Sequence, residues 1–367
     1  MTEYIHDLAD WPRFTWSEAA LADKLAAVRH RQGRLFGRMG ALGFALRGEA
    51  QLVTLTEDVL KSSEIEGERL DRAQVRSSVA RRLGLDVAGL VPSDRNVDGV
   101  VEMMLDATRN FGTELTADRL FAWHAALFPA GRSGMSRIVT GTWREAASGP
   151  MQVVSGAVGH ETVHFEAPAA DRMPGEMRAF LAWFNGKTAL DPVLKAAVVH
   201  LWFVTLHPFE DGNGRIARAL ADMQLARSED SAQRFYSLSA QIRQERGDYY
   251  AMLERTQKGD LDITVWLIWF LDVLDRAFDG AETTLAHVLT RARVWEKLAG
   301  QPLNERQSKA INRLLDGFEG KMTSSKWAAL TKTSADTALR DIQDLVARGV
   351  LVKLAGGGRS TGYRLAE

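Results

Sequence analysis

Residues 207–218 gather, within twelve positions, side chains that together could carry out chemistry on a nucleotide phosphate. His207 has a ring that titrates near neutral pH, which suits a general base. Asp211 offers the hard oxygen ligand that Mg²⁺ prefers when it bridges phosphates. Arg215 and Arg218 lie three apart on a predicted helix and can each grip phosphate oxygens with a planar fork of donors. The set therefore indicates nucleophilic attack on a nucleotide phosphate.

Between the base and the arginines lies Gly212-Asn213-Gly214, which we interpret as an anion hole. Glycines let the backbone bend sharply, so that successive N–H groups point at one spot. That spot is also the start of a helix, where the dipole and the free amides favour an anion. Alone, an Asp-Gly-Asn-Gly run is usually a turn and a His-Pro pair usually a helix end. Their joint occurrence favours catalysis.

Two helices must position these groups. The segment 190–206 is strongly apolar with helical spacing, and it ends before Pro208 because the residue preceding a proline avoids helical angles. A second helix is predicted to begin near Asn213, with a buried stripe formed by Ile216, Ala219, Leu220 and Met223.

The twelve residues resemble the signature of the Fic family, HPFxDGNGRxxR, at every specified position. The resemblance implies a protein adenylyltransferase, which moves AMP from ATP to a protein hydroxyl with pyrophosphate as the leaving group. It implies that His207 is the base and that Asp211 holds Mg²⁺ at the α- and β-phosphates. The anion hole would receive the α-phosphate. Arg215 would hold the β- and γ-phosphates, Arg218 would hold the γ-phosphate, and Phe209 would be a buried anchor.

An earlier segment resembles the inhibitory motif of the same family, [ST]xxxE[GN], through Ser62, Glu66 and Gly67. From composition alone, the acidic run that contains it is typical of a solvated helix end. The resemblance implies that Glu66 pairs with Arg218 and denies that arginine to the γ-phosphate. A brake within the same chain is therefore expected.

Two further resemblances concern the surroundings of the site. The stretch from Thr140–Arg144 through Gln152–Val154 is similar to the Fic flap, a hairpin that aligns a target segment by β-augmentation. Tyr249 and Tyr250 have the helical spacing of core aromatics, but the resemblance suggests that one of them lines the adenine pocket. His160 and His164 lack the carboxylate pair of a metal site, and we interpret them as hairpin residues.

The overall pattern predicts a mainly α fold with three parts: a helical N-terminal region at 1–100 carrying the inhibitory helix, a Fic core at 101–300 with its β-hairpin flap, and a winged helix at 303–367. Helices are predicted near 17–44, 49–66, 71–83, 100–111 and 116–127, with a loop at 84–99. Ser17 and Asp71 are the predicted N-caps of the first and third helices.

Composition bounds the classes of function. The 367 residues carry a net charge of -1 and no cysteine, which excludes disulfides and thiolate metal sites. The first residues show no signal-peptide pattern, and no apolar run approaches the length of a membrane span. We therefore expect a soluble, cytoplasmic protein that does not enter membranes.

The sequence also bears on partners other than ATP, Mg²⁺ and a protein substrate. Residues 303–367 hold eleven Lys and Arg against seven Asp and Glu, and a basic winged helix suggests nucleic acid. The third helix of this part carries Asp336, Asp341 and Asp344, however, so protein docking or a homodimer is favoured over nucleic-acid binding. Two alternative functions remain: a Fic-type enzyme that uses another nucleotide or removes AMP, and a DNA-binding regulator with a nucleotide-sensing core. The intact His207 disfavours the regulator.

Overall fold

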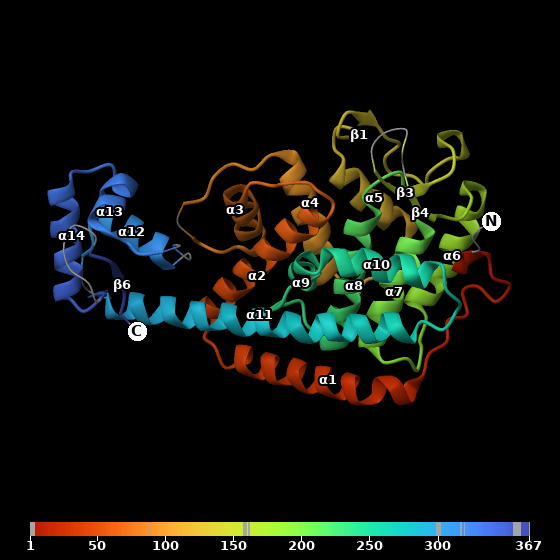
Figure 1. Ribbon diagram of the computed structural model, residues 1–367, viewed down its shortest axis with the longest axis horizontal. Coiled ribbons are helices and arrows are strands. Elements are labelled where there is room, and N and C mark those ends of the chain that lie inside the picture. Colours follow the sequence, from red (N-terminus) through yellow and green to blue (C-terminus); the bar gives the residue numbers. More distant parts are fainter. Residues whose placement is uncertain are drawn as a thin grey trace. The chain divides into compact units, whose positions relative to one another are not determined.

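The computed structural model describes residues 4–87, 89–156, 160, 162–298, 302–315, 318, 320–354 and 361–366. The chain divides into two compact units, residues 1–282 and 283–367, which we describe separately. Both are mainly helical within the described residues (Figure 1). The predicted α fold is confirmed, whereas the predicted boundaries at 100 and 300 stay predictions. Within the described residues, no helix is both long and apolar enough to span a membrane.

The first unit opens with an aromatic arm and three helices. After the 3₁₀ turn Ile5–Asp7, α1 spans Glu18–Gly40, α2 Phe44–Ile65 and α3 Arg72–Leu83. The predicted caps are confirmed, because Ser17 accepts a hydrogen bond from the Ala20 N–H and Asp71 accepts one from the Gln74 N–H. Helix α2 begins five residues earlier than predicted, behind Gly43.

Helices α4 (Arg95–Arg109) and α5 (Ala117–Leu127) pack against each other. The predicted loop at 84–99 is therefore too long, because Asp94 accepts a hydrogen bond from the Val97 N–H and starts α4 inside it. The contact between the two helices is close. A Cβ built on Gly99 would lie 1.8 Å from the Ala126 carbonyl oxygen, so only glycine fits at that position.

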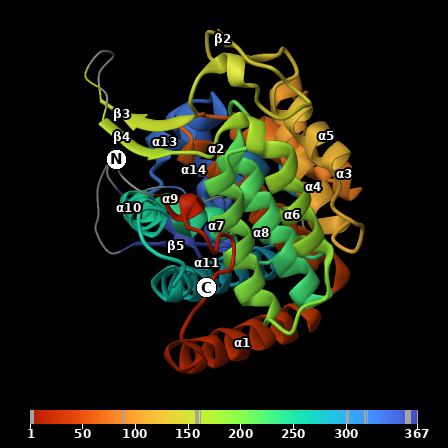
Figure 2. The same cartoon turned by 90° about the vertical axis from the view of Figure 1, so that its right-hand side faces the viewer.

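The centre of this unit is the antiparallel pair α7 (Pro192–Leu206) and α8 (Asn213–Glu229), seen side by side in Figures 1 and 2. Helix α6 (Met173–Asn185), which follows the 3₁₀ turn Ala170–Arg172, packs on α7. Every residue of α7 from Val193 onward is buried, although the sequence suggested one buried face. A helix that is apolar around its whole circumference requires neighbours on all sides.

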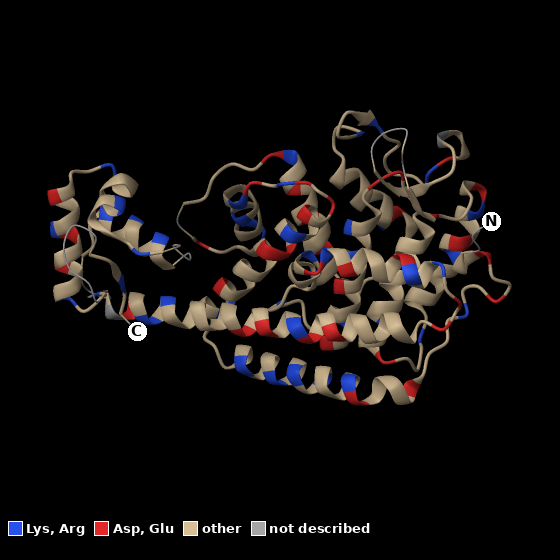
Figure 3. Cartoon of the chain, in the orientation of Figure 1, with Lys and Arg blue, Asp and Glu red and all other residues tan. Residues whose placement is uncertain are grey.

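Three more helices complete the enclosure: α9 (Leu238–Gln244), α10 (Arg246–Gln257) and α11 (Thr264–Lys297). The Trp266 indole of α11 donates a hydrogen bond to the Ala197 carbonyl, 2.9 Å away on α7. Basic residues of α1 face acidic residues of α11, as Figure 3 shows. The ion pairs are Lys24–Asp272, Arg31–Asp275, Arg31–Asp279 and Arg38–Glu282.

Two short hairpins lie near the catalytic segment. Strands β1 (Arg132–Ser133) and β2 (Ser136–Arg137) form the first, and β3 (Gln152–Ser155) and β4 (Thr162–Glu166) form the second, with a bulge at Val153–Val154. The prediction that residues 140–144 form a strand of the flap is wrong. Strand β3 pairs with β4 instead, while residues 140–144 follow an irregular path to the 3₁₀ turn Ala146–Ser148.

The second unit has the element order on which the winged-helix prediction rests. Helices α12 (Glu305–Leu315), α13 (Ser324–Thr331) and α14 (Ala335–Ala347) precede the antiparallel pair β5 (Leu351–Lys353) and β6 (Tyr363–Leu365). The glycine run 356–358, which we expected to form the tip between these two strands, lies outside the described residues. The core of the second unit centres on Trp327, with Ile311, Ile342 and Leu345 around it. Asp341 is only 6% exposed and pairs with Arg306, so it faces inward rather than toward a ligand.

Candidate active site

His207 ends α7 in a conformation that holds its ring in one tautomer. The residue has a φ of 48° and a ψ of 56°, so the chain turns sharply before Pro208. The ring Nδ1 lies 2.9 Å from the Val204 carbonyl oxygen, which can only accept, so Nδ1 carries a proton. Burial lowers the pKa of His207 below its ordinary value of 6.5, against the opposing effect of that hydrogen bond. The neutral ring therefore presents Nε2 as a proton acceptor.

Arg144 braces this turn, and sequence reasoning missed it. The side chain is 5% exposed, and its Nε donates to the His207 carbonyl at 2.8 Å. Its Nη2 donates to the Pro168 carbonyl, and its backbone N–H donates to the Pro208 carbonyl at 2.9 Å. Arg144 thus ties the catalytic turn to the segment that follows β4. An isolated arginine 63 positions away gives no sequence signal for such a contact.

Phe209 is the buried anchor that the sequence suggested. Its side chain is fully buried and stacks on the His124 ring, with ring centroids 4.2 Å apart. Burial lowers the pKa of His124 to about 4, so that ring is neutral as well. Trp143 also packs on Phe209, with ring centroids 5.1 Å apart. The aromatic cluster fixes the backbone between His207 and α8.

Asp211 lies partly exposed at the end of the turn. One carboxylate oxygen accepts a hydrogen bond from the Gly212 N–H at 2.5 Å, and the other accepts one from the Ser133 hydroxyl. A single oriented carboxylate fits Mg²⁺, which is usually held by one or two carboxylates together with substrate phosphates. In the part of the chain that the structure describes, no group of three or more His, Asp or Glu side chains could hold a metal by itself.

The expected anion hole lies at the first turn of α8. Gly212 has a φ of 80°, a left-handed conformation that favours glycine, and α8 begins directly after it. The Asn213 side chain is used internally: its amide accepts from the Phe209 N–H at 3.0 Å and donates to the Phe209 carbonyl at 2.8 Å. The backbone N–H groups of the first turn have no partners inside the helix. They form an anion-binding end, and the Asn213 side chain stabilises the loop that shapes it.

Arg218 is occupied by the end of α2. Its guanidinium is 1% exposed and lies 2.8 Å from the Glu66 carboxylate. It also donates to Ser62, to the hydroxyl at 2.9 Å and to the carbonyl at 2.8 Å. A Cβ built on Gly214 would lie 2.2 Å from the Glu66 carboxylate, so that carboxylate sits directly on the first turn of α8. Glu66 therefore occupies the space in front of the anion-binding end.

Arg215 has an acidic partner that the sequence did not suggest. It donates to the Glu68 carboxylate at 2.5 Å, and its guanidinium also lies 4.9 Å from the centre of the Phe128 ring. The Arg215 side chain is 5% exposed and that of Glu68 is 38% exposed. Both signature arginines are thus paired with carboxylates from one short segment.

Gly67 makes this double pairing geometrically feasible. With a φ of 85° it terminates α2, and the Glu68 N–H donates back to the Ser63 carbonyl at 3.0 Å. This left-handed helix end with a bond back across the last turn is a Schellman arrangement, which needs glycine at the turning position. The chain reverses at Gly67 and brings Glu66 and Glu68 to the same side, against α8.

The two tyrosines lie at different depths. Tyr249 is 1% exposed, and its hydroxyl is bonded to His200 at 2.9 Å, as expected for a core residue. Tyr250 is partly exposed and donates to the Ile65 carbonyl at 3.3 Å. Arg246 donates to the same carbonyl at 2.8 Å. The proposal that an aromatic lines the adenine pocket is therefore best assigned to Tyr250, which contacts the end of α2.

The two flap histidines differ in their contacts. His164 lies 2.8 Å from the Glu254 carboxylate and 2.6 Å from the Ser155 hydroxyl. The bond to Glu254 joins β4 to α10, and the bond to Ser155 joins β4 to β3. His160 is exposed.

Two buried carboxyl groups, Asp58 and Asp222, lie where α2 meets α8. Asp222 of α8 is 1% exposed and forms an ion pair with Arg234, and Asp58 of α2, 4% exposed, accepts from the Ser237 hydroxyl at 2.5 Å. Burial and the neighbouring Asp58 carboxyl raise the pKa of Asp222 well above its ordinary value. The packing of α2 on α8 therefore buries two acidic side chains next to each other.

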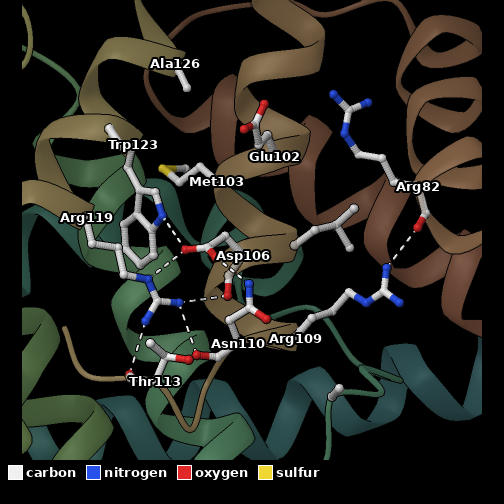
Figure 4. Close-up of a pocket in the computed structure, with 13 residues that line it drawn as sticks. Arg82, Glu102, Met103, Asp106, Arg109, Asn110, Thr113, Arg119, Trp123 and Ala126 are labelled. Carbon is white, nitrogen blue, oxygen red and sulfur yellow. Dashed lines mark hydrogen bonds and ion pairs between the residues drawn. The ribbon is translucent and has the colours of Figure 1, made fainter. Parts of the chain in front are cut away.

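A cavity with a volume of about 920 Å³ lies elsewhere. Figure 4 shows the residues that line it, most of which come from α4 and α5. Asp106 in its wall accepts from the Arg119 guanidinium and from the Trp123 indole, both at 2.7 Å. Its lining includes none of residues 207–218, and these contacts hold α4 to α5. We therefore assign the chemistry to the turn between α7 and α8.

Parts of this chain are similar to known proteins. Residues 114–225 match the Fic/DOC family, and residues 4–85 match a domain of unknown function, DUF4172. The protein adenylyltransferase fic-1 of Caenorhabditis briggsae is 31% identical over 129 residues, 35% of this chain and 24% of that protein. The protein adenylyltransferase Fic of Nematostella vectensis is 36% identical over 96 residues, 26% of this chain and 21% of that protein. The matched part spans less than a quarter of each relative.

The fold extends beyond the matched segment. A crystal structure of a Fic family protein from Desulfovibrio desulfuricans G20 superposes with a TM-score of 0.55 at 21% identity. The similarity covers 97% of this chain and 98% of that one, so it includes the helices that precede and follow the signature.

Proposed function

Because the chain carries a Fic domain over residues 114–225, we propose that it is a protein adenylyltransferase, which transfers AMP from ATP to protein hydroxyl groups, its own included. The relatives above are named protein adenylyltransferases, which supports the reaction class. The observation that carries the proposal is the catalytic turn itself. His207 presents a neutral Nε2 immediately before a helix start that offers free N–H groups and two buried arginines.

In the proposed step, the target hydroxyl oxygen attacks the α-phosphorus of ATP. The new O–P bond forms, the bond between the α-phosphorus and the bridging oxygen breaks, and pyrophosphate leaves. The hydroxyl proton passes to Nε2 of His207, while the other ring proton stays on Nδ1, which donates it in a hydrogen bond to the Val204 carbonyl. The N–H groups of Asn213 and Gly214 stabilise the negative charge on the α-phosphate oxygens.

The remaining groups bind the rest of the nucleotide. Asp211 would hold Mg²⁺, which neutralises charge on the departing pyrophosphate when it is bound. Arg215 and Arg218 would hold the β- and γ-phosphates. Tyr250 would pack against the adenine.

We further propose that the end of α2 restrains this activity. Glu66 and Glu68 pair with the two arginines that the β- and γ-phosphates need, so the acidic turn takes the place of the triphosphate. Glu66 also covers the first turn of α8 at Gly214. A productive ATP pose therefore requires both carboxylates to leave, which couples nucleotide binding to a rearrangement at Gly67.

The test is intact-mass spectrometry of the Glu66→Gly chain after incubation with ATP and Mg²⁺. The proposal predicts a mass increase by one or more AMP groups. The double variant Glu66→Gly/His207→Ala should show none, and a double variant that gains the same mass would rule out His207 as the base. An unchanged mass for Glu66→Gly itself would contradict AMP transfer.

A further inference from the structure

The β1–β2 and β3–β4 hairpins lie at the same end of the first unit (Figures 1 and 2), and both expose apolar side chains. Met135, at the tip of β1–β2, is 92% exposed, and Val139 just beyond it is 42% exposed. On the neighbouring hairpin, Val154 and Val163 are 48% and 40% exposed. Such a concentration of exposed apolar groups marks an interaction surface rather than ordinary surface scatter.

The β1–β2 hairpin is fixed to the catalytic turn on both sides of its tip. Before the tip, the Ser133 hydroxyl donates to the Asp211 carboxylate. Beyond it, the Val139 N–H donates to the Glu210 carboxylate at 3.0 Å. These two bonds hold Met135 beside the turn that carries His207, where a protein substrate must lie.

The same hairpin is cationic. Arg132 and Arg137 face each other across the register of β1–β2, and both are exposed. The Arg132 guanidinium donates to the Met135 carbonyl, which shapes the tip but leaves its charge uncompensated. Within the residues that the structure describes, Arg137 has no hydrogen-bond or ion-pair partner, and Arg132 has no acidic one. The exposed apolar tip is therefore flanked by two unpaired positive charges.

We propose that residues 132–139, which we term the catalytic lip, dock an acidic segment of the protein substrate that also carries an apolar side chain. The apolar side chain would pack on Met135 and Val139, and substrate carboxylates would face Arg132 and Arg137. A hydroxyl residue next to this segment would then lie at His207. The inference rests on the proposed function, and it names the class of substrate for that site.

The experiment uses the Glu66→Gly chain, ATP labelled at the α-phosphate, and arrayed peptides with a central Thr. Each peptide carries Leu on one side and is made in an acidic version with Asp and a basic version with Lys. We expect the acidic peptides to be labelled at least several-fold more strongly. Adding Arg132→Glu and Arg137→Glu should reverse that preference, and adding Met135→Ser should weaken the labelling of these Leu-containing peptides.

Two controls introduce the same new residues, Ser and Glu, at exposed positions on other elements. Val265→Ser changes a residue that is 40% exposed on α11, and Arg178→Glu changes an exposed arginine of α6. Both should keep the acidic preference. If the Glu66→Gly chain adds AMP to itself but labels both peptide versions equally, or labels neither, the lip proposal is overturned while the proposed function stands. If that chain gains no AMP at all, the proposed function fails first.

Discussion

The Glu66 carboxylate lies 2.8 Å from the Arg218 guanidinium and directly over Gly214, so one side chain both neutralises a signature arginine and fills the helix start. The arginine is 1% exposed and is held further by Ser62, which leaves it few alternative positions. A nucleotide phosphate and Glu66 therefore compete for the same donors, and the predictions below depend on that competition.

Replacing Glu66 by Gly should raise self-modification sharply at saturating ATP. Loss of a charge-assisted pair with a buried arginine shifts the balance between the restrained and the active state by on the order of 1.5–3 kcal/mol. That shift raises the population of the active state roughly 10- to 150-fold. Initial rates of label incorporation from ATP measure this change. An activity equal to that of the wild type would mean that the end of α2 is only a helix terminus.

Replacing Glu68 by Gln should activate the chain more weakly. The Glu68 side chain is 38% exposed, so solvent screening lowers the free energy of its pair with Arg215 to about 1 kcal/mol. Loss of that free energy should change the activity several-fold. Glu64→Gln is the matched control, since Glu64 pairs with Lys61 and Arg243 rather than with a signature arginine. A titration with ATP should show that Glu68→Gln binds ATP more tightly than the wild type does. Glu64→Gln should bind ATP as the wild type does. Equal effects of the two variants would argue against a specific Glu68–Arg215 restraint.

Arg218→Ala should stay inactive although it removes the partner of Glu66. The γ-phosphate needs the same guanidinium, so loss of the restraint does not create a competent site. The double variant Glu66→Gly/Arg218→Ala should therefore behave like the arginine single variant. Thermal unfolding should accompany the assay, because Arg218 is buried and its removal leaves the Ser62 carbonyl without that donor. A folded Arg218→Ala chain with raised activity would refute the dual role.

Transfer by the Glu66→Gly chain should persist below the pH at which an ordinary histidine becomes protonated. Burial lowers the pKa of His207 from 6.5, so the neutral base survives further into acid. The acidic limb of the pH–rate profile should thus lie below 6.5, once ATP is saturating. An acidic limb above that value would show that a different group, or a His207 stabilised as a cation, controls the rate.

The local features of the site could be read from the sequence, whereas its non-local supports could not. The turn at His207-Pro208 and the helix start at Asn213 follow from proline and glycine chemistry, and Ser17 and Asp71 follow from capping rules. Arg144 can donate to the His207 carbonyl only because the fold brings these two distant residues together. Glu68 becomes a partner of Arg215 only through the left-handed turn at Gly67.

The pairing of the strands in the flap could not be predicted from the sequence either. Strand propensity marks both 138–144 and 152–166, but the choice of partner for β3 depends on packing. Burial of Phe165 favours β4, and the side chain of Arg144 is taken by the carbonyls of the catalytic turn. Strand pairing of this kind is set by tertiary context more than by intrinsic preference.

AMP transfer is tested most directly by following the two ends of the ATP molecule separately on the Glu66→Gly chain. Parallel reactions should contain ATP labelled either at the α-phosphate or at the γ-phosphate, and the denatured protein should be counted after each. Transfer of AMP predicts that label from the α-phosphate stays on the protein while label from the γ-phosphate appears as pyrophosphate. Label from the γ-phosphate retained on the protein, or label from neither position, would contradict the proposed reaction.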